Sequence, residues 1–183
     1  MPFLPIEPFN INYGLNQQAT LSVMLFPKNP KKRKEYVRQP GLLLIGIDVS
    51  KAKHNACIGT KKGIVQRKLT FVHCRKGFQV FEKIIRKTMF KYKAKRVLIA
   101  MEPSGIYWYA LYERLKSCGY GVCLVNCQAV SNNRKTMPEG INKTDEKDAH
   151  SIFDLLMQGK FLLPVQRDPE LSAAYRMMQR HMF

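Results

Sequence analysis

The sequence predicts an α/β protein with a mixed sheet, in which the first three strands are antiparallel and helices cover both faces. Two observations lead to this prediction. Three strand-sized segments follow one another with short links between residues 42 and 71. From residue 76 onward, helical and strand-sized segments alternate, which is typical of β–α–β units with parallel strands. No apolar run approaches the roughly 20 residues that a membrane helix needs.

The first three strands are predicted from short apolar or alternating segments. Residues 42–50, which read L-L-L-I-G-I-D-V-S, are rich in aliphatic residues and too short for a helix, so they predict a buried strand. Residues 53–60 and 64–71 predict a hairpin with Gly63 in its turn. The short links between the three segments favour antiparallel pairing.

A helix, a strand and a second helix are predicted next. Residues 76–90 carry apolar side chains on one face and lysines on the other, which indicates an amphipathic helix. Residues 97–102 predict a buried strand that ends in Glu102. Pro103 suits the first turn of a helix that extends to about residue 118.

A last strand and a last helix complete the predicted fold. The strand covers residues 121–126, and the helix covers residues 145–158, with Thr144 as its N-cap and Gly159 at its end. The ribonuclease-H-like fold has this order of elements. The halves of the actin and sugar-kinase ATPases have the same order, so the two fold families stay open at this point.

The charge of the chain indicates a polyanionic partner. Its 31 Lys and Arg against 13 Asp and Glu give a formal net charge of +18, which is self-repulsive unless a polyanion such as nucleic acid is bound. The sequence shows no basic helix with a broad apolar face, which is the pattern that would indicate binding to a membrane surface. The five cysteines form no C-x-x-C pair, and no secretory signal precedes the fold. We therefore expect a cytoplasmic nucleic-acid-binding protein with reduced thiols and no membrane partner.

The N-terminal 40 residues differ from the rest of the chain. They hold six of the ten prolines and show no sustained periodicity, so we expect an irregular basic arm over residues 1–40 and a folded domain over residues 41–160. The run K-N-P-K-K-R-K at 28–34 is a solvated linker, a nucleic-acid-binding arm or a nuclear-import signal.

Two acids terminate predicted strands. Asp48 ends the first strand on the face of Leu44 and Gly46, and Glu102 ends the strand before Pro103. Taken singly, each is explained as a strand-ending or helix-starting residue. If the two strands are neighbours, however, both acids lie at the carboxyl edge of the sheet, where α/β enzymes bind their ligands.

Two further acids lie in the stretch K-T-D-E-K-D-A at 143–149. Asp145 and Asp148 are three residues apart and share one face of the predicted helix, whereas Glu146 points elsewhere. The apolar positions Ala149, Ile152 and Leu156 continue the same face, so both aspartates are predicted to face the sheet. Gathered carboxylates repel one another unless a cation lies between them, and Mg²⁺ or Mn²⁺ prefers such oxygen ligands. Two ions about 4 Å apart can promote phosphodiester cleavage.

The motifs G-I-D-V-S-K (46–51), E-P-S-G-I-Y (102–107), V-N (125–126) and K-T-D-E-K-D-A (143–149) occur in this order. They resemble the N-terminal domain of the insertion-sequence-one-hundred-and-ten group of transposases. The resemblance covers about residues 41–160. It implies a RuvC-like fold and a D-E-D-D metal tetrad, which maps onto Asp48, Glu102, Asp145 and Asp148.

The resemblance also implies a function and partners. It implies a DNA recombinase that moves its own element with two Mg²⁺ or Mn²⁺ ions, is guided by a bridge RNA and forms a homo-oligomer when full length. The family has a C-terminal domain with a proposed nucleophilic serine. We therefore expect residues 161–183 to begin a helical linker to such a domain, and the chain to be a truncated gene or an N-terminal fragment.

Neighbouring residues and other functions stay open. Lys51 and Lys143 either contact phosphate or are solvated, Tyr107 and Trp108 are expected to be core residues, and Gly105 is expected to permit close packing.

One alternative function is a non-catalytic nucleic-acid-binding remnant. Another is an ATP-binding domain of the actin and sugar-kinase type, although no glycine follows Asp48 as its phosphate loop requires.

Overall fold

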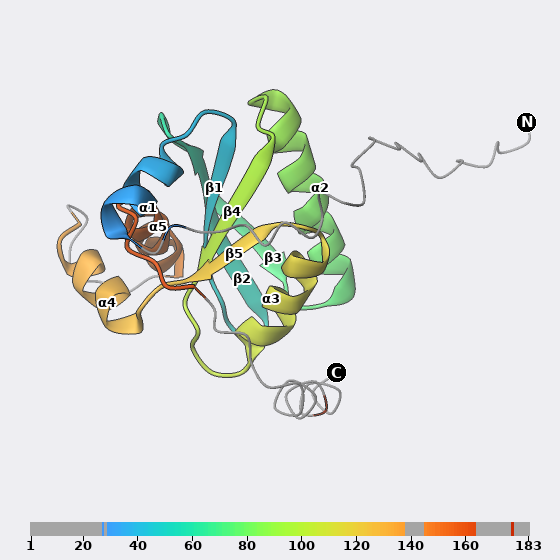
Figure 1. The fold of residues 1–183 in the computed structure, drawn as a ribbon. Coiled ribbons are helices and arrows are strands. Elements are labelled where there is room, and N and C mark those ends of the chain that lie inside the picture. The colour runs from blue at the N-terminus through green and yellow to red at the C-terminus, as the bar shows by residue number, and fades with distance from the viewer. Residues whose placement is uncertain (1–26, 28, 138–144, 164–176, 178–183) are drawn as a thin grey trace, which may run out of the picture.

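The structure is a computed structural model that describes residues 27, 29–137, 145–163 and 177. A five-stranded sheet forms its centre (Figure 1). The strands are β1 (Leu42–Asp48), β2 (Lys53–Thr60), β3 (Gly63–Val72), β4 (Arg96–Met101) and β5 (Gly121–Leu124).

The sheet has the order β3-β2-β1-β4-β5. β2 pairs antiparallel with both β1 and β3, whereas β4 pairs parallel with both β1 and β5. This order and these directions are those of the ribonuclease-H-like fold. The predicted fold class, with three antiparallel strands followed by parallel ones, is therefore confirmed.

Helices cover both faces of the sheet, as expected (Figure 1). The helices α2 (Arg75–Lys91) and α3 (Tyr107–Ser117) pack on one face. The helices α1 (Pro30–Val37), α4 (Cys127–Lys135) and α5 (Asp145–Met157) pack on the other. We call these the α2/α3 face and the α5 face.

The α2/α3 face is filled by aliphatic and aromatic side chains. Alternate residues of β1, such as Ile45 and Ile47, are fully buried there. Phe81 of α2 stacks on Phe71 of β3, with ring centroids 4.1 Å apart and planes 5° apart. Trp108 is 5% exposed and belongs to this core, which confirms its expected place.

On the α5 face, a helix lies directly on the backbone of the sheet. A Cβ atom added to Gly46 of β1 would lie 2.4 Å from the backbone N of Phe153 and 2.7 Å from the carbonyl O of Ala149, both in α5. Gly59 of β2 likewise leaves room for the Phe153 ring. Glycine in these central strands therefore sets how closely α5 approaches the sheet.

Two helices were not expected from the sequence. Residues 30–37, placed in an irregular arm, form α1, where Asn29 accepts a hydrogen bond from the Lys31 N–H and Pro30 takes the first helical position. Residues 127–135 form α4, whose N-cap Asn126 accepts from the N–H groups of Gln128 and Ala129. The division into domains at residues 40 and 160 stays a prediction. No helix in the described part of the chain is long and apolar enough to cross a membrane.

Candidate active site

Asp48 and Glu102 lie at the same edge of the sheet. The last register pair of the parallel strands β1 and β4 joins Ile47 to Met101, and the two acids are the next residues of each chain. Both residues are partly exposed. The two strands are therefore neighbours, which was the condition for placing both acids together at the carboxyl ends of parallel strands.

Both acids continue rows of side chains that face α5. Leu44 precedes Asp48 in one row, and Leu98 and Ala100 precede Glu102 in the other, and all three belong to the core under α5. The Cys127 thiol at the start of α4 lies near the Glu102 carboxylate. Burial, followed by this neighbouring carboxylate, raises the pKa of the Cys127 thiol.

Asp148 lies on the sheet-facing side of α5, as predicted. It is 5% exposed, and the next residue, Ala149, contacts Gly46 of β1. Arg134 of α4 donates a hydrogen bond from Nη1 to Asp148 Oδ1, and both side chains are largely buried. The guanidinium therefore compensates the charge of this aspartate.

The remaining predicted site residues lie in the link after β1, at the start of α5 and just before it. Asp145 is the first residue of α5, and only its backbone is described. Lys143 and the expected N-cap Thr144 lie outside the described residues. Lys51 is exposed in the link between β1 and β2, three residues after Asp48. The orientation of Asp145 and the roles of both lysines stay predictions.

The chemistry of the predicted tetrad fits a hard divalent cation. Asp48, Glu102, Asp145 and Asp148 offer only carboxylate oxygens, which Mg²⁺ and Mn²⁺ prefer. Within the part of the chain that the structure describes, no three His, Cys, Asp or Glu side chains are gathered to hold a metal ion. Asp148 is instead satisfied by Arg134.

The link that follows Asp48 is held by two histidines that the sequence analysis did not assign to the site. The backbone N–H of Ser50 donates to Nδ1 of His54 at 3.3 Å, and His54 Nε2 lies 2.7 Å from Nδ1 of His73. The backbone N–H of His73 donates to the carbonyl of Ala52 at 2.9 Å. The two histidines therefore fix the backbone between Asp48 and β2.

These contacts define the protonation of the pair. Because His54 Nδ1 accepts from Ser50, His54 carries its proton on Nε2 and donates it to His73 Nδ1. His54 is fully buried, and His73 is 7% exposed. Burial, followed by repulsion from His73, lowers the pKa of His54 to about 3, and burial also lowers the pKa of His73.

Helix α4 is joined to α5 by polar contacts besides the Arg134–Asp148 pair. Asn133 Nδ2 donates to Ser151 Oγ at 3.2 Å, and Ser151 Oγ donates to the carbonyl of Val130 at 3.0 Å. Asn126 as an N-cap is the one sequence signal that was available for α4.

Gly105 was expected to permit close packing beside Glu102, and this prediction is wrong. A Cβ atom at Gly105 would meet nothing within 4 Å, and its φ of 64° is the reason for glycine there. The glycine that permits close approach at this edge is Gly46.

The family model DEDD_Tnp_IS110, described as "Transposase", matches residues 45–183. The chain belongs to this transposase family. The match includes all four acids of the predicted tetrad. The family resemblance that the motifs indicated is therefore confirmed.

Two solved structures resemble the fold. The first, "T. thermophilus RuvC in complex with Holliday junction substrate", is 12% identical over 77% of this chain and 93% of that chain, with a TM-score of 0.35. The second, "Thermus thermophilus RuvC structure", is 14% identical over 73% of this chain and 88% of that chain, with a TM-score of 0.33. No curated protein matches the chain significantly.

Proposed function

We propose that this member of the transposase family is a DNA recombinase catalytic domain that cleaves phosphodiester bonds and exchanges strands with the help of Mg²⁺ or Mn²⁺. The observation that supports this most is the parallel pairing of β1 and β4, which brings Asp48 and Glu102 to one sheet edge. The helix that carries Asp148 packs on the same strand through Gly46.

Each acid has a distinct place in the proposed site. Asp48 and Glu102 supply carboxylate oxygens from the rigid sheet edge, and Asp145 and Asp148 supply them from the first turn of α5. When bound, two divalent ions would help to activate the attacking oxygen and to stabilise the leaving one. The His54–His73 pair holds the Ser50 backbone, and so fixes the chain just after Asp48.

DNA is the proposed substrate. The net charge of +18 favours phosphate contacts, and Lys51 is exposed beside the acid edge. We further propose, from membership of the family, that Lys143 contacts phosphate, that a bridge RNA selects the DNA, that the full-length protein is a homo-oligomer, and that it works in the cytoplasm.

Cleavage of branched and supercoiled DNA tests this function. The full chain is incubated with Mg²⁺ or Mn²⁺, and we expect nicking that Asp48→Asn and Glu102→Gln abolish while DNA binding is kept. Glu113→Gln, on α3 of the opposite face, is the matched control and should nick as the unchanged chain does. Nicking that survives both acid substitutions would refute the proposed site.

A non-catalytic nucleic-acid-binding domain is the second candidate. The observation that favours it is the Arg134–Asp148 pair, because an aspartate compensated by arginine needs no metal. This candidate predicts DNA binding without nicking under either ion. It also predicts that carboxylate substitutions leave the affinity for Mn²⁺ unchanged.

A further inference from the structure

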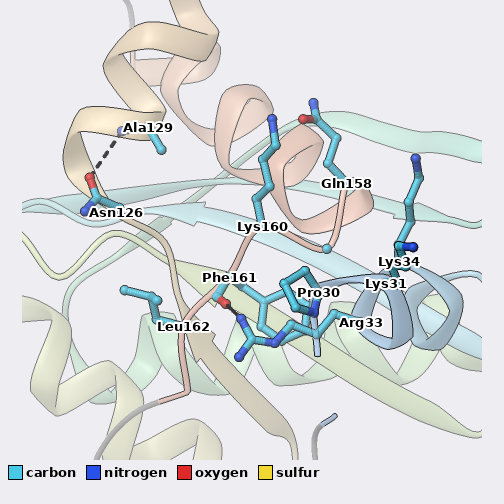
Figure 2. Close-up of a pocket in the computed structure, with 11 residues that line it drawn as sticks. Pro30, Lys31, Arg33, Lys34, Asn126, Ala129, Gln158, Lys160, Phe161 and Leu162 are labelled. Carbon is cyan, nitrogen blue, oxygen red and sulfur yellow. Dashed lines mark hydrogen bonds between the residues drawn. The ribbon is translucent and has the colours of Figure 1, made fainter. Parts of the chain in front are cut away.

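A cavity with largely apolar walls lies on the α5 face, between the start of α1, the start of α4 and the segment that follows α5 (Figure 2). Its volume is about 480 Å³. Four of its lining residues are cationic, and among the lining residues that the structure describes none is acidic. The cations are Lys31, Arg33, Lys34 and Lys160.

The cations are held together by specific packing. A Cβ atom at Gly159 would lie 2.7 Å from the backbone N of Lys34, so this glycine lets α1 approach the segment that carries Lys160. Arg33 stacks on the ring of Phe161, 5.3 Å from its centroid, and donates a hydrogen bond to the Phe161 carbonyl (Figure 2). It also donates a hydrogen bond to the carbonyl of Pro27. The lysine cluster is thus built into the fold despite its self-repulsion.

Two helix N-termini add to the positive potential of the cavity. The first turn of α1 and the first turn of α4 both border it, and neither first turn contains an acid. Cationic side chains are unfavourable at the N-terminus of a helix, which is the positive end of its dipole, yet α1 begins with lysines and an arginine. An anion in the cavity would relieve both kinds of repulsion.

The cavity is connected to the acid edge by α4. Asn126, which lines the cavity, immediately precedes Cys127, whose thiol lies near the Glu102 carboxylate. The ammonium groups of Lys31, Lys34 and Lys160 belong to exposed residues, and no described carboxylate pairs with them. Several exposed cations around one cavity fit a chain of phosphates better than a single one.

We propose that this cavity binds the phosphodiester backbone of a nucleic acid strand and directs it toward Glu102. Lys31, Lys34 and Lys160 contact phosphates, while Arg33 and Phe161 form the wall. The contacts are to the backbone, so DNA and RNA are both bound. The inference rests on the nucleic-acid partner of the proposed function but not on its catalytic acids.

Salt-dependent binding tests the proposal. The full chain is compared with the triple variant Lys31→Gln, Lys34→Gln, Lys160→Gln, using a labelled DNA duplex and an RNA of the same sequence. Each lost phosphate contact should make the slope of log K against log salt shallower by about 0.9 for duplex DNA, so we expect a change of about 2 to 3. The corresponding triple Lys→Arg variant should keep the original slope.

A matched variant controls for net charge. Lys62→Gln, Lys83→Gln, Lys87→Gln removes the same charge from exposed residues of the β2–β3 turn and α2, outside the cavity lining. We expect its slope to change by less than about 1. Equal changes in the two Gln variants would overturn the proposal.

Two further arms distinguish a strand-binding cavity from a small-ligand site and from the catalytic acids. A mononucleotide is titrated into both proteins. If it binds more weakly to the cavity variant while the DNA and RNA slopes stay unchanged, the cavity is a small-ligand site and the proposal is wrong.

The salt-dependence experiment is repeated with Asp48→Asn, Glu102→Gln in both backgrounds. We expect the cavity effect to persist there, so a failure of the catalytic proposal would not imitate a failure of this one.

Discussion

The two faces of the sheet are built in different ways. On the α2/α3 face, helices pack through large side chains, such as Phe81 stacked on Phe71. On the α5 face, a helix approaches the strand backbone itself, because Gly46 has no side chain. Asp48, Glu102 and Asp148 are all associated with the α5 face. Close packing of a helix on the central strand β1 thus coincides with the predicted chemistry, whereas both faces contain a buried apolar core.

Among the described residues, an arginine–carboxylate pair joins two helices on each face. Arg114 of α3 donates to both oxygens of Glu82 in α2, at 2.7 and 3.1 Å, and the Arg114 side chain is 44% exposed. Arg134 of α4 donates to Asp148 of α5, and these side chains are 16% and 7% exposed. The Glu82 side chain is 10% exposed, so the two carboxylates are buried to a similar extent and the pairs differ in the exposure of the arginine. Only the second pair contains a predicted metal ligand.

Removing the buried arginine should have the largest effect on stability. Arg134→Gln leaves the Asp148 carboxylate buried without its cation, and we expect a loss of about 3 kcal/mol in the free energy of unfolding. Arg114→Gln should cost less, about 1 to 2 kcal/mol, because the Glu82 carboxylate is buried but water already reaches the pair from the exposed Arg114 side. Urea denaturation of both variants measures the difference.

Divalent ions sharpen this comparison. Because Asp148 in Arg134→Gln is free to bind a cation, Mg²⁺ or Mn²⁺ should stabilise that variant more than the unchanged chain. The same ions should not recover the stability that Arg114→Gln loses. Equal stabilisation of all three proteins would show that Asp148 takes no part in metal binding.

The glycine contact should have the next largest effect. In Gly46→Ala, the new Cβ would lie 2.4 Å from the Phe153 backbone, so α5 must shift, and we expect a cost of about 2 kcal/mol. Gly105→Ala is the matched control, since it meets no atom within 4 Å and carries only the cost of its positive φ, about 1 kcal/mol. Thermal unfolding in parallel compares them. A smaller cost at Gly46 than at Gly105 would mean that α5 can move freely on the sheet.

The histidine pair should give an effect that is absent at neutral pH and grows as the pH falls. The unfolded chain protonates His54 near the ordinary pKa of 6.5, whereas the fold lowers this pKa to about 3. The folded state thus binds fewer protons, so stability is complete above pH 6.5 and is lost as the pH falls toward 3. We expect a slope of about 1.4 kcal/mol per pH unit from His54.

Denaturation between pH 7 and pH 4.5 measures this slope. His54→Gln removes the titrating group and should flatten the slope, even though it lowers stability at neutral pH. If the slope is the same in the variant and in the unchanged chain, His54 is not a buried neutral histidine.

The sequence was sufficient for the features that depend on periodicity. Apolar strands and the stripe of Ala149, Ile152 and Leu156 predicted the mixed sheet and the sheet-facing side of α5, and all three residues are buried there. Asp48 and Glu102 were placed at one edge because carboxyl ends of parallel strands meet. These inferences use only local pattern and general topology.

The missing features depend on tertiary contacts. Helix α4, C-Q-A-V-S-N-N-R-K, has only Val130 buried and contains weak helix formers, so its contacts with α5 stabilise it. Gly46 and Gly105 look alike in sequence, yet one permits close packing and the other a positive φ. The Asn29–Pro30 start of α1 was a readable signal that the surrounding lysines and prolines obscured.

The central claim is that acids from β1, β4 and α5 form one divalent-metal site. Calorimetric titration of Mn²⁺ into the full chain and into Asp48→Asn, Glu102→Gln and Asp148→Asn tests it most directly, with Glu113→Gln as the control on the other face. We predict that each of the three acid substitutions weakens binding by at least about tenfold, since even outer-shell substitutions cost that much, and that the control does not. An equal Mn²⁺ affinity in all five proteins would contradict the claim.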